Sequence, residues 1–136
     1  YTCSGEDVSP ALEWTDPPEG TRELAMVVDD PDAPSRTFVH WVLYDLDAGI
    51  SELPERVPAG EQLDSPIACR QGRNDADVMG YSGPCPPGGE EHRYFFKLYA
   101  LDEAINLRPG VTKAELMDEI DGKVIAEAEL MGTYRR

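Results

Sequence analysis

Basic residues are scarce in this chain of 136 residues, which holds 12 Lys and Arg against 27 Asp and Glu. The formal net charge is −15, and only three of the basic residues are lysines. Binding to nucleic acid needs clustered cations that displace counterions from phosphates, so this balance argues against DNA and RNA as partners. Anionic membrane surfaces are disfavoured for the same reason.

An acidic surface with few lysines is also expected of a protein that works in high salt, because the Debye length falls to about 3 Å at 1 M. Ordinary acidity for solubility explains the same composition, and both interpretations stay open. A melting temperature that does not rise between low and molar KCl would refute adaptation to salt.

Long apolar runs are also absent, since none approaches the roughly 18 residues that a membrane-spanning helix needs, and we expect no membrane insertion. No signal peptide is visible, although the chain begins at Tyr1 rather than Met, which leaves an upstream segment open. The three cysteines, Cys3, Cys69 and Cys85, show no zinc spacing and can form at most one disulfide. This usage favours a reducing compartment, and we expect a cytoplasmic protein.

Three apolar stretches predict the central strands of a sheet. Glu23 to Asp29 and Thr37 to Asp47 are apolar on both faces, as expected of strands buried on both sides. The third stretch, His92 to Leu101, is rich in aromatic residues. Strict alternation along the second stretch places His40 on the same face as Val42.

The remaining segments are less regular. Residues 48–79 contain three prolines and no helical period, so they are expected to form a long irregular excursion. Helix is predicted after Thr112, which forms a capping box with Glu115, whereas residues 124–134 fit a helix or a strand. We predict one domain over residues 1–136, mainly β, of the antiparallel Greek-key sandwich type with one or two short C-terminal helices.

Both histidines lie on predicted central strands, and a carboxylate lies at the turn between the first two strands. The residues expected to converge at one end of the sheet are Asp30, His40, His92 and Tyr94. Imidazole and phenol groups donate hydrogen bonds to anions, a carboxylate raises the pKa of a nearby histidine, and the Gly- and Pro-rich loop from Gly80 offers rigid backbone N–H groups. The pattern predicts a small-anion pocket; the alternative is that both histidines are core residues paired with carboxylates.

Other kinds of site fit the sequence less well. The segment Gly80-Tyr81-Ser82-Gly83 resembles a nucleophile elbow, but Pro84 stands where the second glycine is needed. An iron triad of two histidines and one carboxylate lacks its paired His and carboxylate two positions apart. Cys85 has no neighbouring cation except a histidine and is expected to be buried and inert. Neither a phosphate-binding loop nor a dinucleotide fingerprint is present, and we expect no cofactor or metal.

Four short motifs occur in order along the chain: Asp30-Pro31-Asp32-Ala33-Pro34, Val39-His40-Trp41, Gly80-Tyr81 with Gly83-Pro84-Cys85-Pro86-Pro87, and His92-Arg93-Tyr94. With flanking matches such as Gly132-Thr133-Tyr134, they span essentially the whole chain. Together they resemble the phosphatidylethanolamine-binding protein family, in the prokaryotic branch often called Raf-kinase-inhibitor-like.

The resemblance implies a β-sandwich with a small preformed pocket that takes phosphate, acetate-like anions or a phosphoryl-ethanolamine headgroup. The residues that carry these roles by resemblance are Asp30, His40, His92 and Tyr94, with Asp32, Gly83 and Pro84 in the motifs around them. Two departures stand out. The family usually has about one more strand before this point, so the chain is expected to lack a short N-terminal strand, and Ala76 stands where an aromatic often follows Asn-Asp.

We therefore expect a small-anion-binding protein that acts as a binding, regulatory or inhibitory module rather than an enzyme. In this hypothesis His40 and His92 donate to the anion, and Asp30 orients or charges one of them. The alternative is a hydrolase or isomerase that uses a His/Asp pair as acid and base. The resemblance also suggests a kinase or protease as protein partner and, by analogy, a homodimer. The net charge predicts weak affinity, worth about 4–6 kcal/mol.

Overall fold

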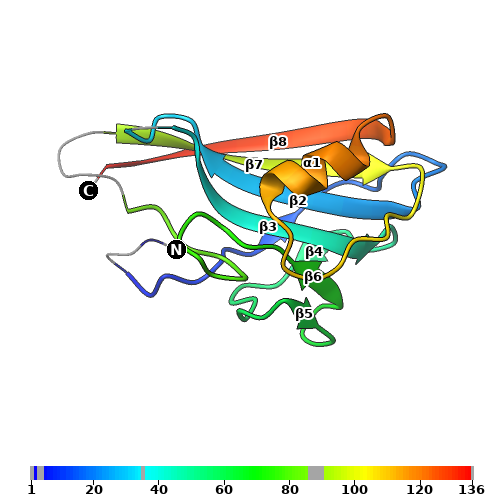
Figure 1. The fold of residues 1–136 in the computed structure, drawn as a ribbon, viewed down its shortest axis with the longest axis horizontal. Helices are drawn as coiled ribbons and strands as arrows, with labels where there is room; N and C mark the ends of the chain where they lie inside the picture. The colour runs from blue at the N-terminus through cyan, green and yellow to red at the C-terminus, as the bar shows by residue number, and fades with distance from the viewer. Residues whose placement is uncertain (1, 3–4, 35, 86–90, 136) are drawn as a thin grey trace.

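The computed structural model describes residues 2, 5–34, 36–85 and 91–135 (Figure 1). Two antiparallel sheets and one helix, α1 (Lys113–Ile120), make up its regular structure in those residues. The larger sheet has the spatial order β5 (Gln62–Leu63), β6 (Cys69–Gln71), β3 (Phe38–Asp47), β2 (Glu23–Asp30), β7 (Glu91–Leu101) and β8 (Val124–Arg135). The smaller sheet pairs β1 (Leu12–Glu13) with β4 (Glu52–Leu53). The predicted mainly β, antiparallel fold is confirmed.

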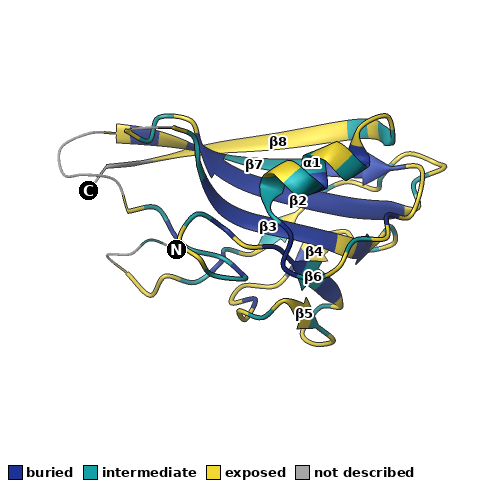
Figure 2. Cartoon of the chain, viewed as in Figure 1, coloured by how far each residue is buried: buried dark blue, intermediate teal, exposed yellow. Residues whose placement is uncertain are grey.

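The larger sheet is buried on both faces in its centre. All eight residues of β2 are buried, as expected for a central strand without a polar face. On one face, α1 packs Leu116 and Ile120 against Val27 and Val42 of the sheet. On the other, Leu53 of β4 and the N-terminal segment cover a second apolar cluster. The arrangement is a sandwich with unequal layers, in which β2 and β3 are dark blue in Figure 2 and the edge strand β8 is mostly yellow.

A β-bulge corrects the face that alternation predicts for His40. Val28 pairs with Trp41 and the next residue, Asp29, pairs with Val39, so His40 is the extra residue on β3. A bulge turns the strand locally and re-aims side chains. His40 therefore lies with the pocket residues of one face, whereas Val42 packs in the cluster under α1 on the other.

The helix begins where the sequence predicts. The Thr112 hydroxyl accepts a hydrogen bond from the Glu115 backbone N–H, and the Glu115 carboxylate accepts one from the Thr112 N–H. This reciprocal pair satisfies two backbone donors that would otherwise lack partners. Lys113 also donates to the buried carboxylate of Asp29 at 2.8 Å, which ties the helix to the end of β2.

Two segments differ from their sequence-based description. Residues 48–79 are not wholly irregular, because they contain the short strands β4, β5 and β6. Residues 124–134, which fit either a helix or a strand, form the long edge strand β8, paired along its length with β7. No helix among the described residues is long and apolar enough to cross a membrane.

Candidate functional site

A cavity of about 310 Å³ opens at the end of the larger sheet. Phe38 and Pro34 are among its apolar walls. Its polar and charged lining residues are Asp7, Asp30, His40, Ser82 and His92. These come from five parts of the chain: the N-terminal segment, the end of β2, the bulge of β3, the loop after Gly80 and the start of β7.

Asp30 and His92 form a buried hydrogen-bonded pair in the wall of this cavity. The His92 Nδ1–H lies 2.7 Å from Asp30 Oδ2, and both side chains are less than 5% exposed. The other oxygen of Asp30 accepts the backbone N–H of Asp32 at 2.7 Å. Both carboxylate oxygens are thus engaged by protein donors, so Asp30 orients His92 and can balance a positive charge on it.

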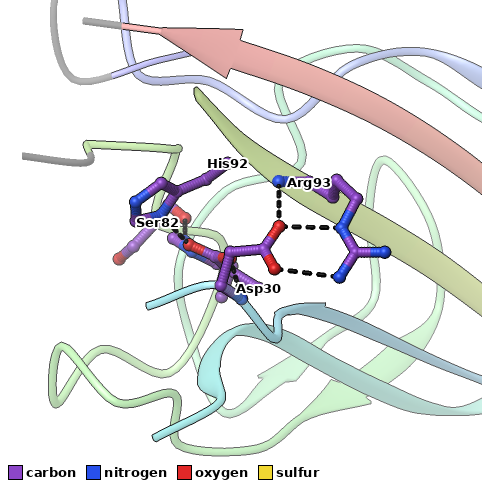
Figure 3. A network of polar contacts seen from close by, with 6 residues as sticks. Asp30, Ser82, His92 and Arg93 are labelled. Atoms are coloured by element: carbon purple, nitrogen blue, oxygen red, sulfur yellow. Dashed lines mark hydrogen bonds and ion pairs between the residues drawn. The ribbon is translucent and has the colours of Figure 1, made fainter. Parts of the chain in front are cut away.

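Asp32 fixes the start of β7 instead of facing the cavity. Its carboxylate accepts the Nε–H of Arg93 at 2.8 Å, an Nη2–H at 2.9 Å and the Arg93 backbone N–H at 2.9 Å (Figure 3). These hydrogen bonds from Arg93 lower the pKa of Asp32 to about 2. This bidentate contact holds the β2–β3 turn against the strand that carries His92.

His40 has one ring nitrogen committed to the protein. Its Nδ1 lies 2.7 Å from the carbonyl oxygen of Ser82 and donates to it. Burial lowers the pKa of His40 below its ordinary value of 6.5, and this outweighs the opposing effects of the Ser82 carbonyl and nearby carboxylates. His40 is accordingly neutral at neutral pH. The hypothesis that it donates to an anion does not describe this neutral form, because its one N–H is already used.

Asn74 holds the pocket loop against β3. Its side-chain N–H groups donate to the carbonyls of His40 and Gly80 at 3.1 and 3.0 Å, and its Nδ2 also lies 3.0 Å from Ser82 Oγ. Its side-chain oxygen accepts the backbone N–H groups of Ala76 and Val78. Asn74 is only 3% exposed, so one buried amide positions both the cavity wall and the Ser82 carbonyl that contacts His40.

Asp7 enters the cavity from the N-terminal segment. Its carboxylate accepts the backbone N–H of Gly83 at 2.6 Å. Its φ is +53°, in the left-handed region that Asp tolerates better than most residues. The backbone conformation and the hydrogen bond together hold a second carboxylate beside the imidazoles.

The structure brings together most, but not all, of the predicted site residues. Asp30, His40, His92 and Gly83 line the cavity. Tyr94 is buried with its ring edge against His40, at 5.3 Å between centroids, and lies behind the lining. Asp32 and Pro84 are placed beside the cavity and are not among its lining residues.

Sequence reasoning missed several lining residues, among them Asp7, Phe38 and Ser82. Asp7 and Phe38 carry no signal of their own, because their place in the cavity depends on the path of the N-terminal segment and on the β2–β3 turn. Ser82 lies inside the Gly80 to Gly83 segment, which does not fit a nucleophile elbow, and nothing else in the sequence marks it as a lining residue. Loop residues are the ones whose position the sequence pattern fixes least.

The cysteines differ from expectation at one position. Cys85 is exposed and disulfide-bonded, and it lines the cavity, so the prediction of a buried inert thiol is wrong for it. Cys69 is the buried free thiol, and burial raises its pKa to about 12. Cys3, Pro86 and Pro87 lie outside the described residues.

Known proteins share this chain's sequence and fold. The family model of phosphatidylethanolamine-binding protein matches residues 1–135. A UPF0098 protein from Methanothermobacter thermautotrophicus is 46% identical over 136 residues, which are 100% of this chain and 88% of that protein. A structure of a phosphatidylethanolamine-binding protein homologue from Chlamydia trachomatis is 40% identical, with a TM-score of 0.89 over 100% of this chain and 86% of the other.

A second solved structure, E. coli YbcL, also has a TM-score of 0.89, at 34% identity over 98% of this chain and 84% of its own. It is named a member of the mammalian PEBP family. The family model and these relatives agree with the order of the motifs and with the antiparallel sheet whose end holds the cavity. The chain belongs to the phosphatidylethanolamine-binding protein family.

Proposed function

We propose that this protein binds a small phosphorylated or carboxylated ligand in the cavity beside Asp30, His40 and His92, and that it acts as a binding or regulatory module. The observation that supports this most is the buried Asp30–His92 pair, 2.7 Å apart in the cavity wall. An imidazole held by a carboxylate can carry a positive charge in a buried place. A protein of net charge −15 needs such a local charge to hold an anion at all.

The size of the cavity is consistent with a small ligand. Its volume of about 310 Å³ lies at the lower end of the range for ligand pockets. Most of its accessible wall surface is apolar, with Phe38 and Pro34 among the lining residues, and hydrogen bonds hold Asp30 and His40 in place. Long-range repulsion from the acidic surface keeps the expected affinity in the millimolar to high micromolar range.

Titration with inorganic phosphate, followed by amide NMR shifts, tests this proposal. Saturable shifts at Ser82, Gly83 and Ala76 are expected in the wild type and lost in His92→Ala. Leu130→Ala is the matched control, because Leu130 is 58% exposed on the edge strand β8 and lines no part of this cavity. Phosphate-induced shifts that are unchanged in His92→Ala would overturn the site.

We also propose that binding, and not turnover, is the activity. Ser82 and the Asp30–His92 pair share one cavity, so the enzyme alternative deserves its own test. A panel of phosphoesters and peptide esters is expected to show no hydrolysis. Turnover by the wild type that His92→Ala abolishes would establish a hydrolase instead.

A regulatory role includes a protein partner, a kinase or protease, as the resemblance suggests. Capture of such a partner that survives His92→Ala would separate protein recognition from the anion site. A cytoplasmic location stays a prediction, and the disulfide at Cys85 is a bond that oxidising compartments favour. Measuring free thiols in protein isolated under alkylating conditions checks whether that bond exists in the cell.

A further inference from the structure

The contact between His40 and Ser82 decides which nitrogen of His40 carries the hydrogen. A carbonyl oxygen only accepts, so the 2.7 Å contact with the Ser82 carbonyl requires a hydrogen on Nδ1 of His40. The neutral ring then has its lone pair on Nε2. Within the described residues, the only hydrogen bond of the His40 ring is the one from Nδ1. Nε2 is therefore the ring nitrogen left to a molecule in the cavity, and it is an acceptor.

The surrounding backbone locks this tautomer. The Ser82 backbone N–H donates to the His40 carbonyl at 3.0 Å, while the Ser82 carbonyl accepts from the ring. Asn74 bridges the same two residues through its side-chain amide. Because three contacts fix Ser82 against His40, the ring cannot exchange its Nδ1 partner without breaking the loop away from β3.

Asp7 adds a second acceptor to the same cavity. One of its oxygens accepts from Gly83, and a carboxylate has about four lone-pair directions, so acceptor capacity remains. The charges of Asp7, Asp30 and Asp29 all act on His40 and favour its protonated form. An anion without any hydrogen would meet a carboxylate and an imidazole lone pair and leave both unsatisfied.

We propose that the site selects anions that keep a hydrogen on one oxygen, such as hydrogen phosphate and the monoanion of a phosphomonoester, over sulfate and phosphodiesters. This inference rests on the proposed function. The P–OH group donates to Nε2 of His40 or to Asp7, and the ionised oxygens lie toward the Asp30–His92 pair. Burial lowers the pKa of His40, which keeps the acceptor form in place at neutral pH.

Phosphate and sulfate, which have the same tetrahedral shape, separate hydrogen donation from size and charge. Calorimetric or NMR titration of the full chain at constant ionic strength and about pH 7 is expected to show phosphate binding at least about tenfold tighter than sulfate. Methyl phosphate loses its remaining hydrogen above a second pKa of about 6, so it is expected to bind like phosphate below that pH and more weakly above it, whereas dimethyl phosphate is expected to bind like sulfate at both. The two esters also separate the sources of the ligand, because a lipid headgroup is a diester and a free phosphate or monoester is not.

Asp7→Asn tests the acceptor directly. The amide keeps an oxygen for the Gly83 N–H and suits the left-handed backbone, but it places N–H donors in the cavity. The ratio of phosphate to sulfate affinity is expected to fall several-fold. Asp118→Asn is the matched control, since it makes the same change of charge at an exposed position of α1 and is expected to keep the wild-type ratio.

Each outcome bears on one of the two proposals. Equal binding of phosphate and sulfate, both lost in His92→Ala, would overturn the selectivity and leave the anion site standing. A ratio unchanged in Asp7→Asn would overturn the role of Asp7 as acceptor. Failure of every one of these anions to bind would overturn the proposed function, and the selectivity with it.

Discussion

The two ends of strand β2 carry buried carboxylates in opposite situations. Glu23 at its start is 5% exposed and Asp30 at its end is 3% exposed. Asp30 has a donor on each oxygen, one from Asp32 and one from His92. Glu23 has no hydrogen-bond partner on its Oε2 within the described residues. Similar burial thus accompanies a difference in hydrogen bonding, because both oxygens of Asp30 have a donor and one oxygen of Glu23 has none.

The difference shows in the chemistry of the two ends. Burial and the neighbouring carboxylate of Asp45 raise the pKa of Glu23 from 4.5 to about 7, against the opposing effects of a hydrogen bond from the Ile105 backbone and of Arg70. Arg70 itself lies 3.6 Å from Asp45 and also donates to the Leu107 carbonyl. A buried carboxylate with a hydrogen-bond donor on each oxygen can act as a charged group in a binding site, whereas one with too few donors is protonated more readily. The four predictions below test this contrast.

The largest effect is expected from removing the well-solvated carboxylate. Asp30→Ala leaves the His92 Nδ1–H and the Asp32 backbone N–H without their acceptor inside the protein. Breaking a buried pair in this way costs about 3–5 kcal/mol of unfolding free energy, measurable by urea denaturation. Asp30→Asn is the milder control, because its amide oxygen still accepts one of the two hydrogen bonds. A loss below about 1 kcal/mol for Asp30→Ala would refute the view that this pair is tightly solvated.

Glu23→Gln is expected to stabilise the protein, and more so as the pH rises. The folded-state pKa lies above the unfolded one, so the native state holds an extra proton between 4.5 and about 7. The wild type loses stability as the pH rises through that interval, by up to about 3 kcal/mol, and the loss is complete above it. The variant lacks this loss, so the two stability curves should diverge toward alkaline pH. Glu103→Gln, at an exposed position, should track the wild type; parallel curves for Glu23→Gln would contradict the assignment.

Most of the fold could be predicted from the sequence, because long strands show clear patterns of apolar residues. Apolar residues on both faces identify β2 and β3, and the aromatic run identifies β7. Strands of two or three residues, as in β4 to β6, are too short to show a period. The segment of β8 alternates small and acidic residues, and only its pairing with β7 selects a strand.

The candidate site is less visible in the sequence than the fold. The motifs bring Asp30, His40 and His92 to attention, and the structure places all three around one cavity. Alternation alone groups His40 with Val42, but one extra residue in β3 shifts every later side chain and puts Val42 on the opposite face. Asp7 reaches the cavity through contacts between segments 76 residues apart, as its bond to Gly83 shows, and no local pattern encodes that distance.

The affinity for sulfate should rise as the pH falls, because His40 lines the cavity at the Asp30 end of β2. Burial lowers the pKa of His40 below 6.5, and this outweighs the hydrogen bond to the Ser82 carbonyl and the charges of Asp30, Asp29 and Asp7, which raise it. His40 becomes cationic only when the pH falls below this lowered pKa, and Nε2 then changes from acceptor to donor. Sulfate affinity is expected to rise about tenfold across this change, as followed by NMR titration. His40→Gln should remove the part of the pH response that belongs to this ring; an identical response in the variant would rule His40 out as its source.

The smallest effect is expected from a substitution of Asp32, which follows Asp30 by two residues but is partly exposed to solvent. Hydrogen bonds from Arg93 lower the pKa of Asp32 to about 2, so the stability that it contributes is present above 3.8 and is lost as the pH falls through about 2. Water and salt screen this exposed pair, so Asp32→Asn should lower the melting temperature only slightly, and less at 1 M KCl than at low salt. Arg93→Lys, which keeps the charge but not the bidentate contact, should fall between the variant and the wild type. If Asp32→Asn instead cost as much stability as Asp30→Ala, the geometry of the partners and not burial would decide how much each carboxylate stabilises the protein.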